Sequence, residues 1–169
     1  MEVIKYLILF LILIISTLIG RTMAKKYVYR VEELEEIKVA LNILKTKIRF
    51  TYEPIPEIFT EIAQNTTRNV KNIFLNAKEK MKESTAETAW QESVDEANAN
   101  LNNEDKRAIK TLAKLLGQTD SEGQISQIEI TEKFIEEQIQ DAISSRQKNE
   151  KLYTRLGTIL GMTIVIILA

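Results

Sequence analysis

The chain has 169 residues, with 23 Lys and Arg against 24 Asp and Glu, and it contains neither His nor Cys. This near-neutral charge, without a basic stripe that carries aromatic residues, argues against nucleic-acid binding. Since His and Cys supply the commonest metal ligands and the usual relay and thiol groups, their absence removes most routes to catalysis. We expect no enzyme activity, no catalytic residues, no metal and no cofactor.

An uncharged apolar stretch opens the chain, from Tyr6 to Gly20. As a helix, Val3 to Gly20 would rise about 27 Å, which crosses a hydrocarbon core about 30 Å thick if the single Lys5 reaches toward the far interface. Lys and Arg beside a span favour the cytoplasmic face, so the chain that follows is predicted to be cytoplasmic. We assign residues 1–24 to a transmembrane helix. The basic flank comprises Arg21, Lys25, Lys26 and Arg30.

From about Val31 to Phe50, apolar residues recur every three or four positions, which predicts one buried face of a helix. Four glutamates crowd the first turns of this segment, where the helix dipole favours negative charge, and we expect them to be solvated. The apolar stripe comprises Leu34, Ile37, Leu41, Leu44 and Ile48, and the glutamates are Glu32, Glu33, Glu35 and Glu36.

Five further amphipathic helices follow. Pro54 and Pro56 end the helix from Val31 to Phe50. Pro56 can also begin the next helix, because a first-turn proline loses no hydrogen bond. Later boundaries are predicted by the N-cap candidates Ser84, Asn103 and Ser121 and by a stop at Gly117. The stripes comprise Ile58, Phe59 and Ile62; Val70, Ile73, Phe74, Ala77 and Met81; Trp90, Val94, Ala97 and Leu101; Ile109, Leu112, Leu115 and Leu116; and Ile125, Ile128, Ile135, Ile139, Ala142 and Ile143.

Each of these helices has one apolar face, so none is stable alone and they must pack together. The fold class is therefore all-α: a compact antiparallel six-helix bundle over residues 25–153, lying between two transmembrane helices, with its last helix running into the second span. Trp90 is expected in the core. Carboxylates at Glu129, Glu132 and Glu136 share one face, and an exposed acidic ridge explains them as well as an acid and base pair.

A second apolar stretch, Leu156 to Ala169, ends the sequence and would rise about 21 Å as a helix. It crosses the bilayer only if neighbouring residues enter the interface and the bilayer thins, and we assign residues 154–169 to a second transmembrane helix. Gly157 and Gly161 lie four apart, so they share a face on which another helix can approach closely. The basic residues before this span again indicate a cytoplasmic bundle: Lys148, Lys151 and Arg155.

Two alternatives stay open at this point. A coiled-coil dimer could form from the first and last soluble helices, although the heptad pattern of the first covers few turns. Alternatively, the N-terminal stretch could be a secretory signal and the C-terminal one a lipid-anchor signal, with Asn65-Thr66-Thr67 as a glycosylation acceptor. The position of the basic cluster, after the first apolar stretch and not before it, favours the membrane-spanning interpretation.

Three segments resemble the stage III sporulation protein AB family of endospore-forming bacteria, and the resemblance covers essentially the whole chain. Lys47 departs from the pattern, where a Glu is expected, and so does Thr119, where a Ser is expected; Lys47 could change a surface contact. The matching residues are Leu44, Thr46, Ile48, Arg49, Phe50, Tyr52, Pro54, Ile55 and Pro56; Leu115, Leu116, Gly117, Asp120 and Gln124; and Gln147, Lys148, Asn149, Glu150, Lys151, Leu152, Tyr153, Leu156 and Gly157.

The resemblance implies a bundle similar to the cytoplasmic modules of the type II secretion platform protein, which contacts a cytoplasmic ATPase. By that analogy the chain would help to assemble the channel between mother cell and forespore, from the mother-cell membrane around the forespore. Its implied partners are the stage III AA ATPase and other AA to AH components, beside membrane lipid and a possible homo-oligomer. A membrane-tethered helical module that transmits a signal is the alternative function.

Overall fold

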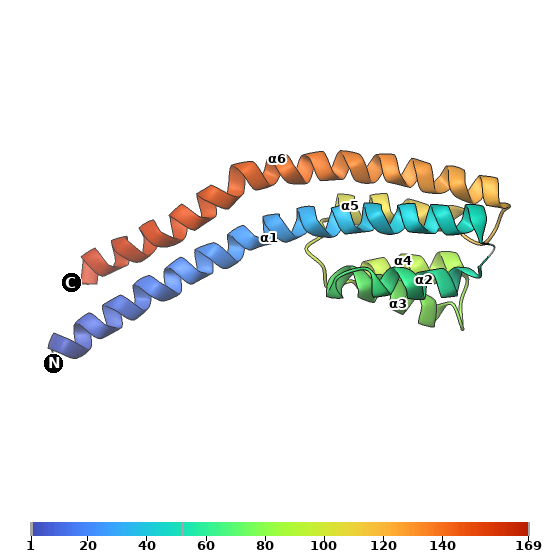
Figure 1. The fold of residues 1–169 in the computed structure, drawn as a ribbon. Helices are drawn as coiled ribbons and strands as arrows, with labels where there is room; N and C mark the ends of the chain where they lie inside the picture. The colour runs from blue at the N-terminus through green and yellow to red at the C-terminus, as the bar shows by residue number, and fades with distance from the viewer. Residues whose placement is uncertain (1, 52, 169) are drawn as a thin grey trace. The chain divides into compact units, whose positions relative to one another are not determined.

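The computed structural model describes residues 2–51 and 53–168, with the side chains of positions 2, 3 and 68 excepted. Within these ranges the chain is all helical, in agreement with the predicted fold class (Figure 1). The elements are α1 (Glu2–Phe50), α2 (Ile55–Gln64), α3 (Arg68–Lys80), α4 (Ala86–Asp95), α5 (Asn103–Lys110), a 3₁₀ turn η1 (Thr111–Lys114) and α6 (Ser121–Leu168).

The chain divides into two packing units, which are described separately. One unit comprises the chain up to Val31 and from Ala142 onward; the other comprises Glu32–Asp141. The helices α1 and α6 continue without a break from one unit into the other. This division concerns packing alone, so the expected membrane boundaries at residues 24 and 154 stay predictions.

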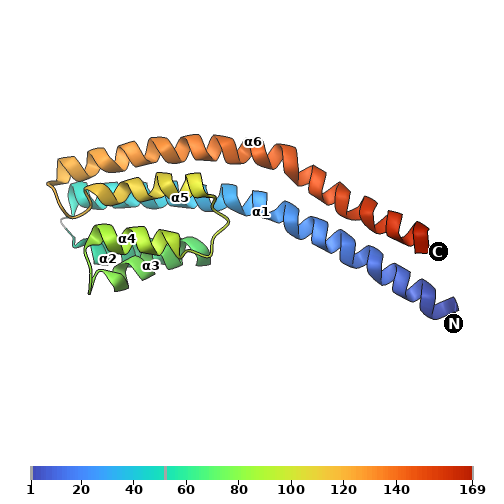
Figure 2. The same ribbon diagram turned by 180° about the vertical axis from the view of Figure 1, so that it is seen from behind.

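In the Glu32–Asp141 unit, α1 and α6 lie side by side, with α2, α3 and α4 together on the other side of α1 (Figures 1 and 2). The predicted apolar stripe of α1 is buried along its whole length, from Leu34 to Ile48. Three aromatic rings meet in the core between the short helices, with centroids 5.1 to 5.5 Å apart: Phe59, Phe74 and Trp90. Trp90 is 1% exposed, which confirms its expected place in the core.

The helix boundaries follow the predicted breaks, but the capping residues differ by one position. Thr85, not Ser84, caps α4 by accepting the N–H of Thr88 at 3.2 Å. Asn102, not Asn103, caps α5 in a reciprocal capping box with Asp105. At α6, Asp120 accepts the N–H of Gly123 at 2.9 Å, ahead of Ser121. A cap requires extended backbone just before the helix, and adjacent polar residues leave its exact position undetermined in the sequence.

The stretch after α5 also departs from the predicted helical period. Gly117 has φ +71°, which fits its predicted role as a stop, because glycine adopts this left-handed conformation without strain. Before it, the chain tightens into η1, and Leu112 and Leu116 are buried while Leu115 is 37% exposed. The inward orientation expected for Leu115 is therefore wrong, because a 3₁₀ turn has three residues per turn and shifts the side chains that follow it.

Candidate functional site

The two glycines predicted as a packing face on α6 both face α1 of the same chain. A Cβ added to Gly157 would lie 2.8 Å from the Cα of Gly20 and 2.8 Å from the carbonyl oxygen of Ser16. A Cβ on Gly161 would lie 3.1 Å from the side chains of both Leu13 and Ser16. The Ser16 hydroxyl donates a hydrogen bond of 2.6 Å to the Gly157 carbonyl. Whether the same glycines also serve assembly with other subunits stays a prediction.

Sequence reasoning missed the α1 side of this contact. Ser16 and Gly20 lie four residues apart in the first apolar stretch, and Gly20 is as buried as Gly157. Small residues at this spacing are the usual face for close packing of helices in membranes. The signal was therefore present in the sequence, as a small residue four positions before the one glycine of that stretch.

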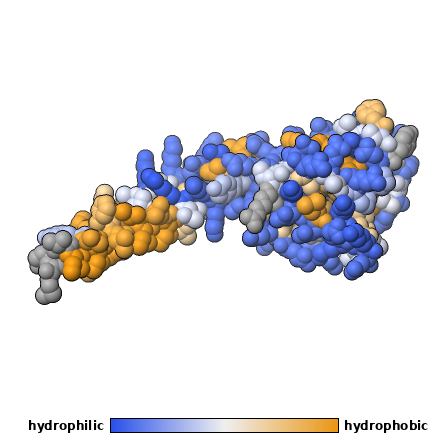
Figure 3. All heavy atoms as spheres, turned by 60° about the horizontal axis from the view of Figure 1, so that its bottom comes forward, coloured by the Kyte–Doolittle hydropathy of each residue, from blue (hydrophilic) through white to orange (hydrophobic). Residues whose placement is uncertain are grey.

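Towards the bundle end of the same unit, the rings of Tyr27 and Tyr153 stack, with centroids 5.7 Å apart and planes inclined by 23°. Hydrophobic residues gather over the terminal part of this unit on the face seen in Figure 3. By length and composition, α1 and α6 are the two helices in the described part of the chain that could cross a membrane. Tyrosine beside such a surface is typical of the interface between hydrocarbon and water.

The predicted basic flank divides into exposed and buried members. Arg30 is 8% exposed, whereas the other predicted members are all exposed. The exposed members are Arg21, Lys25 and Lys26 on α1 and Lys148, Lys151 and Arg155 on α6. We name these six residues the basic collar.

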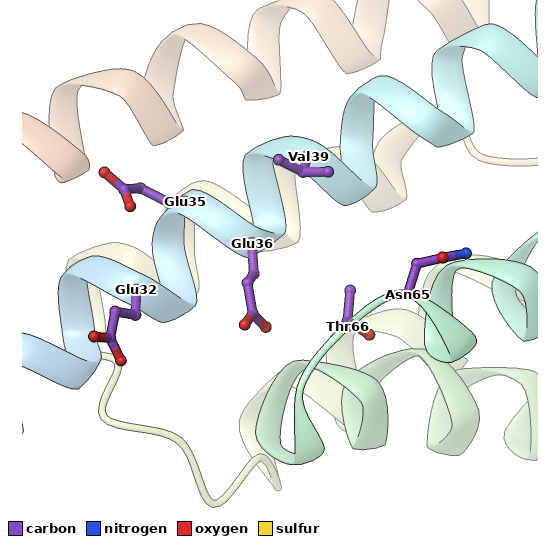
Figure 4. Close-up of a pocket in the computed structure, with 6 residues that line it drawn as sticks. All are labelled: Glu32, Glu35, Glu36, Val39, Asn65 and Thr66. Atoms are coloured by element: carbon purple, nitrogen blue, oxygen red, sulfur yellow. The ribbon is translucent and has the colours of Figure 1, made fainter.

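In the Glu32–Asp141 unit, a shallow groove follows one side of α1 (Figure 4). Glu32, Glu35, Glu36 and Val39 line it from α1, and Asn65 and Thr66 line it from the turn between α2 and α3. Val39 is 57% exposed, although it is a large apolar residue on a helix whose opposite face is buried. Glu32 and Glu35 form no ion pair or hydrogen bond with any residue of the described ranges.

Of the four glutamates between positions 32 and 36, Glu33 and Glu36 form hydrogen bonds that hold the bundle together. Glu33 is 4% exposed and accepts hydrogen bonds from the side-chain amides of Asn69 at 2.7 Å and Asn100 at 2.9 Å. Glu36 accepts the backbone N–H and the hydroxyl of Thr67, at 3.1 and 2.8 Å. The expectation of a solvated, dipole-matched acidic face is therefore wrong for Glu33, and the dipole argument fails because α1 begins at Glu2, far from these residues.

Ion pairs join α1 to α6 on a second surface. Lys38 contacts Glu136 at 2.6 Å, Lys45 contacts Glu132 at 2.5 Å, and the longer Arg49 to Glu129 pair is at 3.9 Å. The hydrogen bond and charge of Lys38 hold the pKa of the Glu136 carboxyl below its usual value. The predicted acidic ridge is thus paired with basic residues of α1.

Lys47, which departs from the family pattern, also has acidic partners. Its ammonium lies 2.6 Å from Glu61 and 3.3 Å from Glu53, and these hydrogen bonds and charges raise the pKa of Lys47. Among the residues that the structure describes, no group of three or more acidic side chains is placed to hold a metal ion.

These features define a class of protein: an all-helical bundle built on two long helices with apolar ends. The profile of stage III sporulation protein AB matches residues 5–169. The chain therefore belongs to the stage III sporulation protein AB family, which gives it a role in sporulation.

One relative is stage III sporulation protein AB of Bacillus subtilis (strain 168), which is 25% identical over 161 residues, or 93% of this chain and 94% of the relative. Among solved structures, a stage III sporulation protein AB is similar with a TM-score of 0.65 at 20% identity, over 70% of this chain and 97% of that one. This second likeness supports the fold.

Proposed function

We propose that this chain is a non-enzymatic platform and assembly protein of the channel between mother cell and forespore. In this proposal the bundle lies in the mother-cell cytoplasm, both long helices cross the membrane around the forespore, and the bundle docks the stage III AA ATPase. Other AA to AH components are its neighbours in the membrane. The sporulation role follows from the family. Docking of the ATPase is inferred from the resemblance to secretion platforms, which contact a cytoplasmic ATPase.

The observation that carries the proposal is the continuity of the two long helices. Each one contains an apolar segment long enough to cross a bilayer and also supplies core residues to the bundle, with helical structure throughout. This supports a bundle that is held at a membrane by two spans, as the proposed platform needs to be.

The groove beside α1 is the surface that suits a protein partner best. Glu32 and Glu35 carry charges that no described residue neutralises, and Val39, one turn after Glu35 on α1, presents exposed apolar area in the same groove. Buried apolar contacts flanked by complementary charge are typical of protein interfaces. We infer that the ATPase presents Lys or Arg side chains around an apolar residue to this groove.

Co-purification in detergent tests the proposal, with the stage III AA ATPase as bait and the full chain as prey. The unmodified chain should be retained at low salt, and less strongly as ionic strength rises, because exposed charges are screened. The variant Glu32→Lys, Glu35→Lys, Val39→Ser should lose at least tenfold in affinity, since it reverses the charge and removes the apolar contact.

The matched control is Glu83→Lys, Glu137→Lys, which reverses two exposed glutamates outside the groove. It should bind the ATPase like the unmodified chain. No retention of the unmodified chain would contradict ATPase docking, and equal losses in both variants would show that net charge, not the groove, governs binding.

A further inference from the structure

The basic collar brings six positive side chains together from two ends of the sequence. Residues 21–31 contain no Asp or Glu, and residues 144–156 contain only Glu150, which pairs with Arg146 at 3.0 Å. None of the six collar residues has an ion pair in the described part of the chain. The collar therefore carries six exposed positive charges that no described residue of the chain neutralises.

Two contacts fix the register that joins the two halves of the collar. Gly20 lies against Gly157, and the ring of Tyr27 stacks on that of Tyr153. In antiparallel helices with this register, Arg21, Lys25 and Lys26 lie at about the same level as Arg155 and Lys151, because each residue adds about 1.5 Å along the axis. Lys148 lies about 7.5 Å beyond Tyr153 on the same rise.

The neighbours of the collar indicate what it binds. On the side of the chain ends, α1 and α6 expose apolar residues such as Leu18, Ile19 and Ile159, each more than half exposed. On the side away from the chain ends, Tyr29 follows Lys25 and Lys26 on α1 and is 43% exposed. The exposed apolar surface and the basic collar beside it match a ligand that has negative charge directly next to hydrocarbon. An anionic phospholipid has its charged headgroup and acyl chains in this arrangement.

We propose that the basic collar binds the headgroups of anionic phospholipids, and that the Gly20 to Gly157 contact joins its two halves into one site. The proposal rests on the membrane insertion in the proposed function, but not on ATPase docking. Each Lys or Arg near an anionic surface strengthens binding about fivefold, so a joined collar discriminates between lipids more strongly than either half alone.

Native mass spectrometry of the full chain in neutral detergent measures this preference. Phosphatidylglycerol and phosphatidylcholine with identical acyl chains are added in turn, and the dissociation constants of the lipid adducts are compared. The unmodified chain should prefer phosphatidylglycerol at least tenfold. In the variant Lys25→Gln, Lys26→Gln, Lys151→Gln that preference should fall below threefold, while Lys71→Gln, Lys114→Gln, Lys133→Gln, which alters exposed lysines outside the collar, should retain it.

A second variant tests the joining contact without changing any charge. Gly157→Leu keeps all six basic residues but cannot pack against the backbone of Gly20, so the preference should fall severalfold. Equal binding of the two lipids by the unmodified chain, or an unchanged preference in either the triple collar variant or Gly157→Leu, would overturn the joined collar. Failure of membrane insertion is a separate result: release of the unmodified chain from membranes by alkaline carbonate would contradict the proposed function itself.

Discussion

The carboxylate of Glu33 on α1 accepts the backbone N–H of Asn100 at 2.6 Å and its side-chain amide at 2.9 Å, across 67 residues of sequence. Together with Asn69, this carboxylate holds the start of α3 and the loop after α4 against α1. Glu33→Ala leaves these donors without an acceptor, and we expect it to lower the free energy of unfolding by about 1 to 3 kcal/mol. Urea unfolding measures the change.

The control for this substitution is Glu35→Ala, two positions away on the same helix but exposed and unpaired among the described residues. It should change the free energy of unfolding by less than about 0.5 kcal/mol. Equal effects of the two substitutions would show that the Glu33 hydrogen bonds do not stabilise the bundle.

Trp90 should make a larger contribution than Glu33. Its ring packs on Phe59 and Phe74, and its indole N–H donates to the carbonyl of Ile109 at 3.0 Å. Trp90→Ala should cost about 3 to 5 kcal/mol, the range for an aromatic ring removed from a core. Phe134→Ala, at a position that is 41% exposed, is the matched control and should cost far less. A change below about 1 kcal/mol for Trp90→Ala would contradict the packing described.

Acid should weaken the contact between α1 and α6. The Lys38 hydrogen bond lowers the pKa of Glu136 in the folded chain from its ordinary value of 4.5. A lowered carboxyl pKa stabilises the fold above the unfolded value, and this contribution disappears as the pH falls through the folded pKa. Unfolding followed by circular dichroism should therefore show a loss of stability below pH 4.5 that is smaller in Lys38→Met. Identical acid dependence in the unmodified chain and in Lys38→Met would show that the Lys38 to Glu136 pair does not stabilise the fold.

The two glycines of α6 should differ in their tolerance of larger side chains. At Gly157 an added group meets the backbone of Gly20, which cannot move aside, whereas at Gly161 it meets the end of the Leu13 side chain and the side chain of Ser16. Gly157→Ile should therefore lower the free energy of unfolding in detergent more than Gly161→Ile does. The expected difference is about 1 to 2 kcal/mol, the scale of contacts between membrane helices, and thermal unfolding measures it. The reverse order would contradict the close approach at Gly20.

The apolar periodicity of the sequence predicted the helices and most of the core, because burial of one stripe per helix is a local property. The pairing of Lys38 with Glu136 and of Lys45 with Glu132 could not be predicted in the same way. Each of these residues resembles a solvated charge until the register of α1 against α6 is known. Glu33 was misjudged for a related reason: its amide partners come from α3 and from the loop after α4, which no local pattern connects to α1.

The candidate surfaces were predictable to different degrees. Gly157 and Gly161 were visible in the sequence because a four-residue spacing defines a helix face, but their neighbour Gly20 comes from the other end of the chain. The basic collar was visible as two flanks, and its assembly into one surface depends on the same register. Nothing in the sequence indicated the groove lined by Val39. Whether a valine on an amphipathic helix is exposed becomes known only when the other helices of the bundle are in place.

Membrane topology tests the central claim most directly, because both the docking platform and the lipid collar require a cytoplasmic bundle on two spans. The chain lacks Cys, so a single introduced thiol reports one position. Asn76→Cys lies on an exposed position of α3, and Lys5→Cys lies on the opposite side of the first apolar stretch. In intact, non-sporulating bacterial cells that carry the chain in their plasma membrane, an impermeant maleimide should label Lys5→Cys at once and Asn76→Cys only after permeabilisation. Labelling of Asn76→Cys in intact cells would contradict the account.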